Sequence, residues 1–595
     1  LNVAGGQWLS GQGAVAANFD TLMGITPPTG TIARPAINGV RPTIQGTITM
    51  NGNTSTVRGV SISPPSASQG LVATTATGIS VSDADVTTSS AAAVNFNGAG
   101  NGTINLTSVT TTGGGNGIIL HNFNSATGSF SVLGDGTNTS VGGNNTGGTI
   151  SGMSGADTGS QNSPFTGVGI YLNNTRGVTL RRIRINGNNS NYGIRGFAVN
   201  GFTLEYSNIS GNNGTVTGTL GTDHMGEGSI YFGSLGISSA ANGHGIVGSA
   251  TFTNNTISGG SNRNLSIQNT VAGTVTVTVK GNTFGLTQNV SGGAQSLFME
   301  TINSGTVLNA VVGGTLAGEP NTFTGSIGDL ANFTGQQQST MDVVFRNNVM
   351  SNNHVSNNVG GGSLNLSTAG TMTFHVTGNT MRDAHGSAVT MYKASATLGT
   401  PSMSGFFSGN TIGVNGVVDS GSKSGNGIFV SAGGTGTMSY TITNNSIFQI
   451  HGNGHIYADN TGGSYTANFT ITGNTLDGEQ PPSWFAGIAI TNGSPGSADT
   501  INVCAKIGGA TAPEKNTLNF TAANGDIGVI VGSSGAGAGH TFNLPGYAGG
   551  ANLTNVQNFL AANNSGSFIA NAYTDSGAST SAFTGIGTSC PTPTN

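Results

Sequence analysis

Acidic side chains that could catalyse a reaction come close together in one loop of this chain. Asp223 and Glu227 flank His224 in the sequence Gly-Thr-Asp-His-Met-Gly-Glu-Gly, directly before an expected strand at 229–232. Two neighbouring carboxylates could serve as the acid and base of a glycoside hydrolase or a polysaccharide lyase. The alternative is that both are loop residues at a corner of the fold. We favour this alternative, because the 21 acidic residues are scattered and show no register of stacked Asp.

Histidines form a second candidate cluster. His354, His385 and His451 each lie six residues after an Asn of the repeated phrase described below. Equivalent positions stack in neighbouring coils of a repeat protein. These side chains, together with Asp383 or with His455 and Asp459 nearby, could therefore hold a metal ion or form a pH-sensitive patch. An ordinary stacked row is the alternative, and we favour it because a row ~10 Å long does not form a tetrahedron. The sequence therefore predicts no metal and no cofactor.

Basic residues gather in a single region of the sequence, comprising Arg176, Arg181, Arg182, Arg184 and Arg195. A shift of 24 residues aligns two Gly-x-Thr-Leu segments and places Arg181 beside Glu205 on the adjacent coil. We expect an ion pair there, with a stabilisation below about 1 kcal/mol because it is a surface pair. Arg182 and Arg184 are expected to face the other side, where they could meet an anionic glycan or a neighbouring subunit. A solvated strand face is the alternative.

Aromatic platforms for sugars are scarce, since the chain has two tryptophans, Trp8 and Trp484. Trp484 follows Pro481-Pro482 and is the best candidate for a carbohydrate-stacking surface. Exposure of its ring would favour binding, whereas burial as a plug at a corner, which we expect, would not. Arg182, Arg184 and Trp484 are the candidate interaction residues.

The elements that must position these side chains repeat along the sequence. Seven times, an Asn is followed two residues later by an apolar residue, at Asn255, Asn282, Asn348, Asn379, Asn410, Asn445 and Asn474. Upstream of each Asn, apolar residues alternate with Thr, Ser or Gly, as at Val275, Val277 and Val279, which is the pattern of a half-buried strand. The apolar parity changes just before the Asn. The chain is therefore expected to bend there and to point the Asn inward.

The spacing of the repeated Asn predicts an all-β, right-handed parallel β-helix with three sides and coils of roughly 30 residues. The 66 residues between Asn282 and Asn348 indicate two coils, one of them without a clean match. Strands of neighbouring coils lie about 4.8 Å apart, so each inward Asn can hydrogen-bond to the next. Such a ladder would satisfy amides that are costly to bury unpaired. The whole chain would form a rod on the order of 100 Å long.

Composition agrees with this fold and excludes other classes. Of 595 residues, 102 are Gly, while 16 are basic and 21 acidic, with a net charge of −5. This balance does not suggest nucleic-acid binding, and no apolar run approaches the ~18 residues of a transmembrane helix. The first residue is Leu1 rather than Met. We interpret this as a processed, mature chain, although the boundary of an excised fragment would look the same.

The C-terminal region differs from the repeats. Residues 543–562 contain a helical pattern with the apolar face Leu553, Val556, Phe559 and Leu560, which predicts a cap over the last coil. Cys504 and Cys590 are expected to form a disulfide in an exported protein, worth about 4.5 kcal/mol in the chain-entropy model. Two buried free thiols are the alternative. We expect three regions: 1–100 as an irregular β region that could serve in assembly, 101–500 as the β-helix, and 501–595 as the last coils and cap closed by the disulfide.

Several segments resemble those of known proteins. Residues 131–152, residues 200–204, the repeated Asn-Thr-Ile phrases, and the tail from Leu-Pro-Gly-Tyr-Ala-Gly-Gly to Cys590-Pro591 resemble large secreted bacterial proteins of the right-handed parallel β-helix, or β-strand-repeat, type. The resemblance covers most of residues 100–595. It implies the fold and export to the cell surface, and it assigns no chemistry to individual residues.

Three classes of function fit these patterns: a structural or adhesive surface protein, a glycan-active enzyme, and a carbohydrate-binding rod. The uniform repeats and the scarcity of charge favour a non-enzymatic extracellular protein that self-associates into a bacterial surface fibre or coat, or acts as an adhesin. Residues 1–20 are the segment most suited to pairing with another subunit. The enzyme interpretation, as a polysaccharide lyase or hydrolase, rests on analogy of fold alone.

Overall fold

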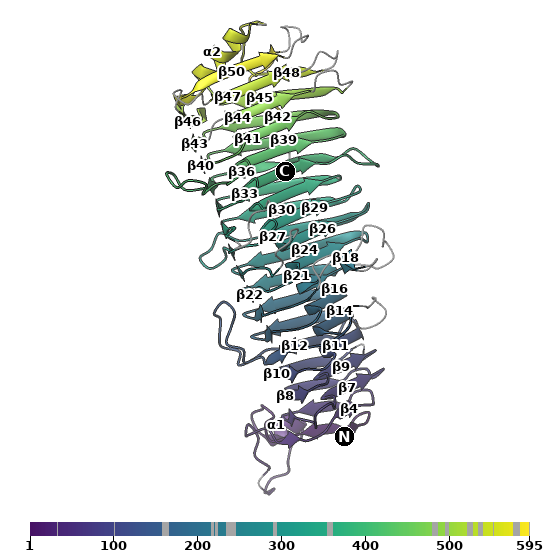
Figure 1. Ribbon diagram of the computed structural model, residues 1–595. Helices are drawn as coiled ribbons and strands as arrows, with labels where there is room; N and C mark the ends of the chain where they lie inside the picture. Colours follow the sequence, from purple (N-terminus) through teal and green to yellow (C-terminus); the bar gives the residue numbers. More distant parts are fainter. Residues whose placement is uncertain are drawn as a thin grey trace. The chain divides into compact units, whose positions relative to one another are not determined.

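The computed structural model describes residues 1–32, 34–99, 101–157, 166–215, 219–220, 224–225, 227–233, 245–288, 294–353, 361–478, 486–493, 499–520, 527–533, 540–550, 552–574 and 583–593. The chain divides into two compact units, Leu1–Asn289 and Val290–Asn595. The regular secondary structure of each is almost entirely β-strand, paired in parallel with strands of the preceding and following coil (Figure 1). The prediction of an all-β parallel β-helix is confirmed.

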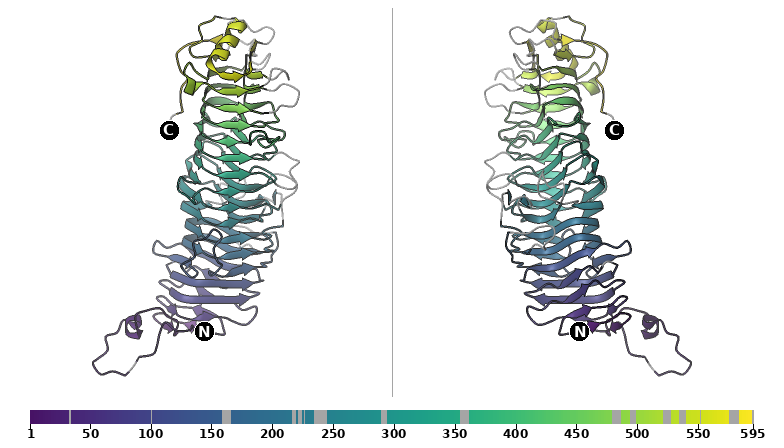
Figure 2. Two further views of the ribbon diagram at one scale, coloured as in Figure 1. Left: turned by 90° about the vertical axis from the view of Figure 1, so that its left-hand side faces the viewer. Right: turned by 90° about the vertical axis from the view of Figure 1, so that its right-hand side faces the viewer.

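The second unit contains three series of stacked strands, one strand of each series per coil (Figure 2). The first series is β27 (Thr306–Val312), β30 (Thr340–Arg346), β33 (Thr371–Thr377), β36 (Ser402–Ser408), β39 (Thr435–Thr443), β42 (Ser464–Thr472), β45 (Ile501–Ile507), β48 (Thr541–Asn543) and β51 (Phe583–Thr584). The second is β28 (Thr322–Phe323), β31 (Val349–Ser351), β34 (Thr380–Arg382), β37 (Thr411–Ile412), β40 (Ser446–Phe448), β43 (Thr475–Asp477), β46 (Thr517–Asn519) and β49 (Ser565–Ser567). The third is β26 (Gln295–Thr301), β29 (Ala331–Gly335), β32 (Leu364–Thr368), β35 (Val389–Lys393), β38 (Ile428–Ala432), β41 (Gly454–Asn460), β44 (Ala486–Asn492), β47 (Ile527–Ser533) and β50 (Ile569–Thr574).

The first unit has the same plan, with some strands long enough to run through two sides of a coil. One series is β1 (Asn2–Val3), β4 (Ile48–Met50), β7 (Leu71–Thr74), β9 (Val94–Asn97), β11 (Asn116–Phe123), β14 (Val168–Arg181), β16 (Tyr192–Glu205), β20 (Gly228–Phe232) and β23 (Arg263–Asn269). The next begins with β2 (Trp8–Ser10), β5 (Thr56–Arg58), β8 (Ser80–Ser89), β10 (Thr103–Thr112) and β12 (Ser129–Val132), and continues through β14 and β16 to β21 (Ile246–Thr253) and β24 (Gly273–Lys280). The last contains β3 (Thr43–Ile44), β6 (Ser61–Ile62), β13 (Thr149–Ser151), β15 (Arg184–Asn186), β17 (Asn208–Ser210), β22 (Thr256–Ile257) and β25 (Thr283–Phe284), with the ends of β8 and β10 between β6 and β13.

Residues 1–100, expected to be irregular, already take part in the stacked coils. Asn2 pairs with Thr49, and Trp8 pairs with Thr56, in the same parallel sense as later strands. The irregular part is an excursion between β2 and β3 that contains the short helix α1 (Phe19–Met23). The N-terminal segment is therefore an integral part of the first coils in this chain.

The predicted Asn ladder is present, and all seven predicted Asn residues are buried. In the second unit, Oδ1 of Asn379 accepts two hydrogen bonds from Asn348, one from its backbone N–H at 2.9 Å and one from its side-chain Nδ2 at 3.0 Å. The same double contact is repeated from coil to coil until the ladder ends at the cap, along Asn321, Asn348, Asn379, Asn410, Asn445, Asn474 and Asn516. In the first unit, Asn255 makes both contacts to Asn282. Each rung thus satisfies a backbone group and a side-chain amide together.

Asn321 supplies the coil that the sequence pattern left without a match. It begins Asn-Thr-Phe, and Phe323 is fully buried like the other apolar partners. The segment before it, 313–320, is a loop that leaves β27 and ends in Pro320, so the upstream apolar alternation is missing. Asn321 therefore occupies the same place in its coil as the other ladder residues, although a loop interrupts the strand before it.

The bend before a ladder Asn has a simple backbone cause. The preceding residue has a positive φ in most coils, for example 55° at Asn254, 66° at Gly378 and 57° at Asn444. The left-handed conformation is costly for most L-residues, and Gly and Asn adopt it most readily. This explains why the ladder phrase so often begins Gly-Asn or Asn-Asn.

The C-terminal end of the second unit is covered by the predicted helix. α2 (Leu553–Asn563) buries Val556 and Leu560 and packs against β50 (Figure 1). Its C-cap residue, Asn564, accepts Nδ2 of Asn516 at 2.8 Å and donates to the Leu560 carbonyl at 2.9 Å. The cap is thus joined to the coils by a final rung of the ladder.

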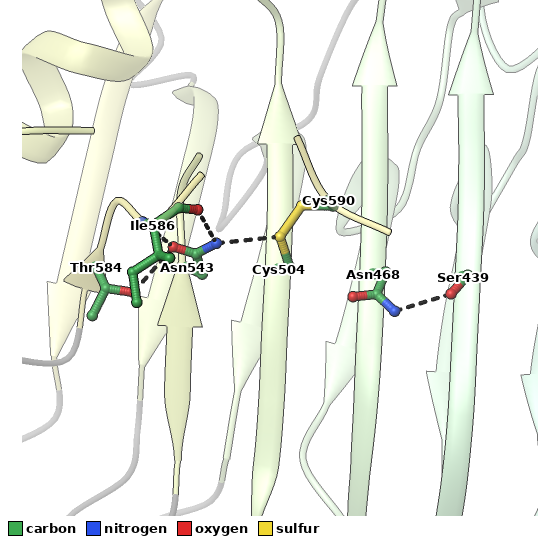
Figure 3. The surroundings of a disulfide bond; sticks show 7 residues. All are labelled: Ser439, Asn468, Cys504, Asn543, Thr584, Ile586 and Cys590. Atoms are coloured by element: carbon green, nitrogen blue, oxygen red, sulfur yellow. Dashed lines mark hydrogen bonds between the residues drawn. A yellow bond between two sulfur atoms is a disulfide. The ribbon is translucent and has the colours of Figure 1, made fainter. Parts of the chain in front are cut away.

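The predicted disulfide is also present. Cys504 lies on β45 and is bonded to Cys590, 86 residues later, in the C-terminal tail (Figure 3). On the neighbouring strand, Asn543 donates to the Cys504 sulfur at 3.5 Å and to the Ile586 carbonyl at 3.0 Å. The tail is therefore fixed to the last coils both covalently and by hydrogen bonds.

Candidate functional site

Glu227, one half of the candidate acid–base pair, anchors a loop in the first unit. Its side chain is fully buried, and Oε2 accepts the backbone N–H of Thr215 at 2.7 Å. Its carbonyl accepts the Ser261 hydroxyl at 3.0 Å. Asp223 lies outside the described residues, and His224 is described only as backbone in β19 (His224–Met225). The catalytic pairing therefore stays a hypothesis.

A polar cavity lies beside this loop. It has a volume of about 570 Å³ and is lined by Asn188, Asn189, Ser190, Asn212, Gly214, Thr215, Ser261 and Gln288. This volume is in the range of small-molecule sites. The lining consists of amides, hydroxyls and backbone, which both donate and accept hydrogen bonds. Such a lining suits an uncharged polar ligand, and the described lining residues include no acid or base.

The cavity owes its shape to a second corner of the coils. β15 and β17 are followed by Gly187 and Gly211, which have φ values of 74° and 75° and turn the chain at equivalent places. Asn189 then donates through Nδ2 to Oδ1 of Asn213 at 2.8 Å, and both are buried. Repetition of this corner on successive coils brings the amide-rich segments side by side.

Arg195, the last basic residue of the cluster seen in the sequence, is completely buried. Its guanidinium stacks over the ring of Phe197 at 4.0 Å and donates to the Gly233 carbonyl at 2.7 Å. Tyr192 and Tyr231 also flank it, at 5.3 Å and 5.1 Å from their ring centroids. Burial raises the pKa of Tyr192 above its ordinary value, and the neighbouring Arg195 charge opposes that rise. The sequence showed the charge of Arg195 but not its aromatic surroundings.

The expectation that Arg182 lies on an open strand face, where it could meet a partner or solvent, is wrong. Only 4% of its side chain is exposed, and its guanidinium donates to the carbonyls of Leu133 and Asn138 at 2.8 and 2.7 Å. It also pairs with Asp135 at 3.3 Å. Hydrogen bonds from the Thr137 backbone and Asn144, with a smaller contribution from Arg182, lower the pKa of Asp135 to about 2. Arg182 thus holds the loop between β12 and β13. Arg184 is half-buried, and its proposed role in binding is untested.

The Arg181–Glu205 ion pair is confirmed, with Nε and Oε2 2.6 Å apart on registered positions of β14 and β16. The Arg181 side chain is 41% exposed. We therefore expect a double-mutant cycle with Arg181→Ala and Glu205→Ala, measured by urea unfolding, to give a coupling free energy below about 1 kcal/mol. The coupling should weaken in high salt because the pair is solvent-accessible. A coupling above about 2 kcal/mol would contradict this assignment of a surface pair.

The histidine row is only partly as expected. His354 lies outside the described residues. Strand bridges join Ala384 to Ser422 and Ser422 to Ile450, so His385 and His451 occupy equivalent positions two coils apart. The coil between them contributes Lys423 at this position, because the long corner segment before it moves Gly416 out of register.

Further contacts of this region also differ from a metal site. His451 pairs with Asp419 at 3.1 Å, and Asp383 accepts the Ser351 hydroxyl at 2.6 Å. Among the described residues, no three His, Cys, Asp or Glu side chains are grouped so that they could hold a metal ion. A pH-sensitive patch at His385 and His451, the less favoured interpretation, is untested.

Another histidine, His455, lies inside the second unit. It is fully buried beside Phe520, and desolvation lowers its pKa to about 3, with an opposing contribution from the Asp477 carbonyl. In the unfolded chain it should titrate near its ordinary value of 6.5. Between these two pH values, His455 is protonated in the unfolded state but stays neutral in the folded state. His455 should therefore lower the free energy of unfolding progressively as pH falls from about 6.5 towards 3.

Urea unfolding at pH 7.5 and pH 4.5 would test this prediction with wild-type protein and His455→Gln. The variant should lose less stability than wild type between the two pH values, because Gln does not titrate. His451→Gln is the matched control, since the His451 side chain is 46% exposed and does not lie in the core. An equal pH response in wild type and His455→Gln would contradict the prediction.

Lys393 is a buried cation that the sequence patterns missed. Its Nζ donates to the carbonyls of Gly433 and Thr435, both at 2.6 Å, and lies 5.0 Å from the centre of the Tyr465 ring. Burial lowers its pKa to about 8. Its contacts are those of a residue that fixes the turn between β38 and β39. The available signal was that Lys393 takes an inward position of β35, where the alternation of the strand calls for an apolar residue.

Trp484, the candidate sugar platform, lies outside the described residues, whereas Trp8 is half exposed on β2. The part of the chain described here contains no helix that combines the length and the apolar character needed to span a membrane. Comparison of the chain with protein-family models, with curated proteins and with solved structures finds no match.

Proposed function

We propose that the protein is a non-enzymatic extracellular structural protein, a β-helix that forms part of a bacterial surface fibre or coat or acts as an adhesin. The observation that carries this proposal is the ladder of the second unit, which runs from Asn321 to the cap residue Asn564. The buried Asn side chains of this ladder join one coil to the next, as suits a protein with a structural role. A disulfide suits a protein that works in an oxidising environment outside the cytoplasm.

Self-association would use the edges and outer faces of the coils. Strand edges present unpaired backbone groups that can accept another chain. Residues 1–20 are the proposed exchanging segment, and the pairing of β1 with β4 and β2 with β5 provides the pattern that a second copy would reproduce. A variant that lacks residues 1–20 and still forms normal fibres would exclude this route.

Negative-stain electron microscopy of the purified chain over a concentration series tests the proposal. Regular filaments or sheets that appear with rising concentration would support a fibre or coat subunit. Single particles at all concentrations would restrict the proposal to an adhesin, which must then bind to a cell or glycan surface in a pull-down. Single particles that bind no such surface would overturn it.

A glycan-active enzyme is the second candidate, and the polar cavity beside Glu227 is the observation that favours it. Incubation with neutral and acidic polysaccharides, followed by assays for new reducing ends and for unsaturated products, distinguishes the two. Product formation that is abolished by Glu227→Gln would establish an enzyme and overturn the non-enzymatic proposal.

A further inference from the structure

Four neighbouring strands of the second unit, β33, β36, β39 and β42, present an outer surface dominated by hydroxyl groups. Their outward positions, at alternate residues from Thr371, Ser402, Thr437 and Thr466, are Thr-Thr-His-Thr, Ser-Ser-Phe-Ser, Thr-Ser-Thr-Thr and Thr-Asn-Thr-Thr. We call these sixteen positions the hydroxyl face. Thirteen of the sixteen are Ser or Thr, and none is Asp, Glu, Lys or Arg.

The strand register arranges the hydroxyl face as a grid. Thr371 is paired with Ser402, and Ser402 with Thr437, so equivalent side chains form columns across the strands. Neighbours lie about 4.8 Å apart across the strands and about 6.7 Å apart along them. The residues between them, such as Met372 and Met403, are fully buried and hold the sheet against the core. The grid is thus supported from beneath by packed side chains.

An aromatic pair lies within the grid. His375 and Phe406 occupy registered positions, and their rings are stacked with centroids 5.1 Å apart and an interplanar angle of 23°. Val344 on β30 precedes His375 in the same column. All three side chains are half-buried and so keep part of their surface open to solvent. They form an apolar strip that hydroxyls border at His375 and Phe406, whereas Asp342 and Arg346 flank it at Val344.

Charge is confined to the borders of this surface. Asp342 and Arg346 lie on β30 at one side, and Lys506 lies on β45 at the other. A face without charge exerts little attraction on a polyanion. Hydroxyls donate and accept hydrogen bonds equally, as sugar hydroxyls do. An exposed ring can stack on the apolar face of a pyranose, as rings pack on other apolar surfaces.

We propose that the hydroxyl face binds an extended, neutral polysaccharide. The His375–Phe406 pair packs against a pyranose ring, and the surrounding Ser and Thr side chains exchange hydrogen bonds with the sugar hydroxyls. Asn468 is buried and instead donates to the Ser439 hydroxyl at 3.0 Å. Each neutral hydrogen bond contributes little net free energy, so a polymer that spans several strands is favoured over a single sugar. This inference rests on the adhesive form of the proposed function and names its partner.

Affinity electrophoresis in gels that contain hydroxyethylcellulose, mannan, laminarin or glycogen tests the proposal, with alginate as the anionic comparison. Wild-type protein should be retarded by at least one neutral polymer and not by alginate. Phe406→Ala should weaken that binding about tenfold, the loss expected of one stacked ring. Phe406→Trp should retain it, since a ring remains available.

Phe429→Ala is the matched control, because Phe429 forms a similar stacked pair with Tyr457 but lies on β38 in the third series. Thermal unfolding followed by circular dichroism should show that all three variants fold like wild type. Binding to none of the four neutral polymers, equal binding by Phe406→Ala, or loss of binding only in Phe429→Ala would each overturn the proposal. A change in sedimentation coefficient caused by Phe406→Ala, without loss of glycan binding, would instead identify the hydroxyl face as a contact between copies. The electron-microscopy test for filaments does not depend on glycan binding, so failure of this inference and failure of the fibre proposal can be told apart.

Discussion

Replacement of Asn410 with Ala is expected to lower the free energy of unfolding of the second unit by about 3–5 kcal/mol, from unpaired buried groups and a cavity together. Asn410 accepts both the N–H and the Nδ2 of Asn379 at 2.9 Å and donates to the Val376 carbonyl at 2.9 Å. The backbone N–H of Asn379 would lose its acceptor in the protein interior. Urea unfolding measures the loss. Thr411→Ala, at the outward neighbouring position, should change stability by less than about 0.5 kcal/mol.

Asn410→Asp tests the hydrogen bonds of the ladder separately from its packing, because Asp has nearly the same size as Asn but lacks the amide donor. Aspartate keeps an acceptor for Asn379 but can no longer donate to Val376 or to Oδ1 of Asn445. A buried carboxylate has a raised pKa in the folded state, so the protonated form is favoured there. The variant should be least stable at neutral pH and should recover part of its stability as pH falls and the acid becomes a donor again. Equal stability of wild type and both variants would refute the ladder as a main source of stability.

The ladder could be predicted because its sequence signal is local. An inward Asn, an apolar residue two positions later and an alternating strand before it all lie within about ten residues. Asn321 was missed because the loop 313–320 removes the alternating part of that signal. The amide still reaches its place, since its position is fixed by Asn348 on the next coil and not by the preceding strand.

The residues at the corners were predicted less well. Arg182 was assigned to a surface by continuing the alternation of β14, but β14 ends at Arg181 and Arg182 has a φ of 55°. A left-handed residue breaks the alternation of side chains. The loop between β12 and β13 then covers the guanidinium. No property of residues 181–184 alone indicates that a loop some forty residues earlier packs over them.

Equivalence of repeat positions also fails at the corners. The offset that relates His385 to His451 points to Gly416 in the coil between them, whereas the backbone register gives Lys423. The corner segment that follows Ile412 is longer than its counterparts, so counting from the ladder Asn loses the register. Strand positions are fixed by pairing, and corner positions depend on loop length. Predictions of sites at the corners of a β-helix therefore need the structure.

Reduction of the Cys504–Cys590 disulfide is expected to destabilise the C-terminal end of the second unit by about 4.5 kcal/mol in the chain-entropy model, given a separation of 86 residues. The bond closes a segment that contains β46 to β51 and α2. Without it the unfolded tail gains conformational freedom, while the apolar contacts of Val556 and Leu560 stay the same. The cap should then open more readily than the coils before β45.

Hydrogen–deuterium exchange measures this loss in place, because a stack of coils can open from one end without unfolding as a whole. Exchange at α2, β48 and β50 should accelerate in wild type treated with dithiothreitol and in the Cys504→Ser, Cys590→Ser double variant. Exchange at β30 and β33 should not change in either. Dithiothreitol should have no further effect on the double variant, which controls for its action elsewhere. Unchanged exchange of α2 after reduction would contradict the prediction. The hydrogen bond between Asn516 and Asn564 and the packing of α2 would then be sufficient to hold the cap, and the disulfide would contribute no stability to it.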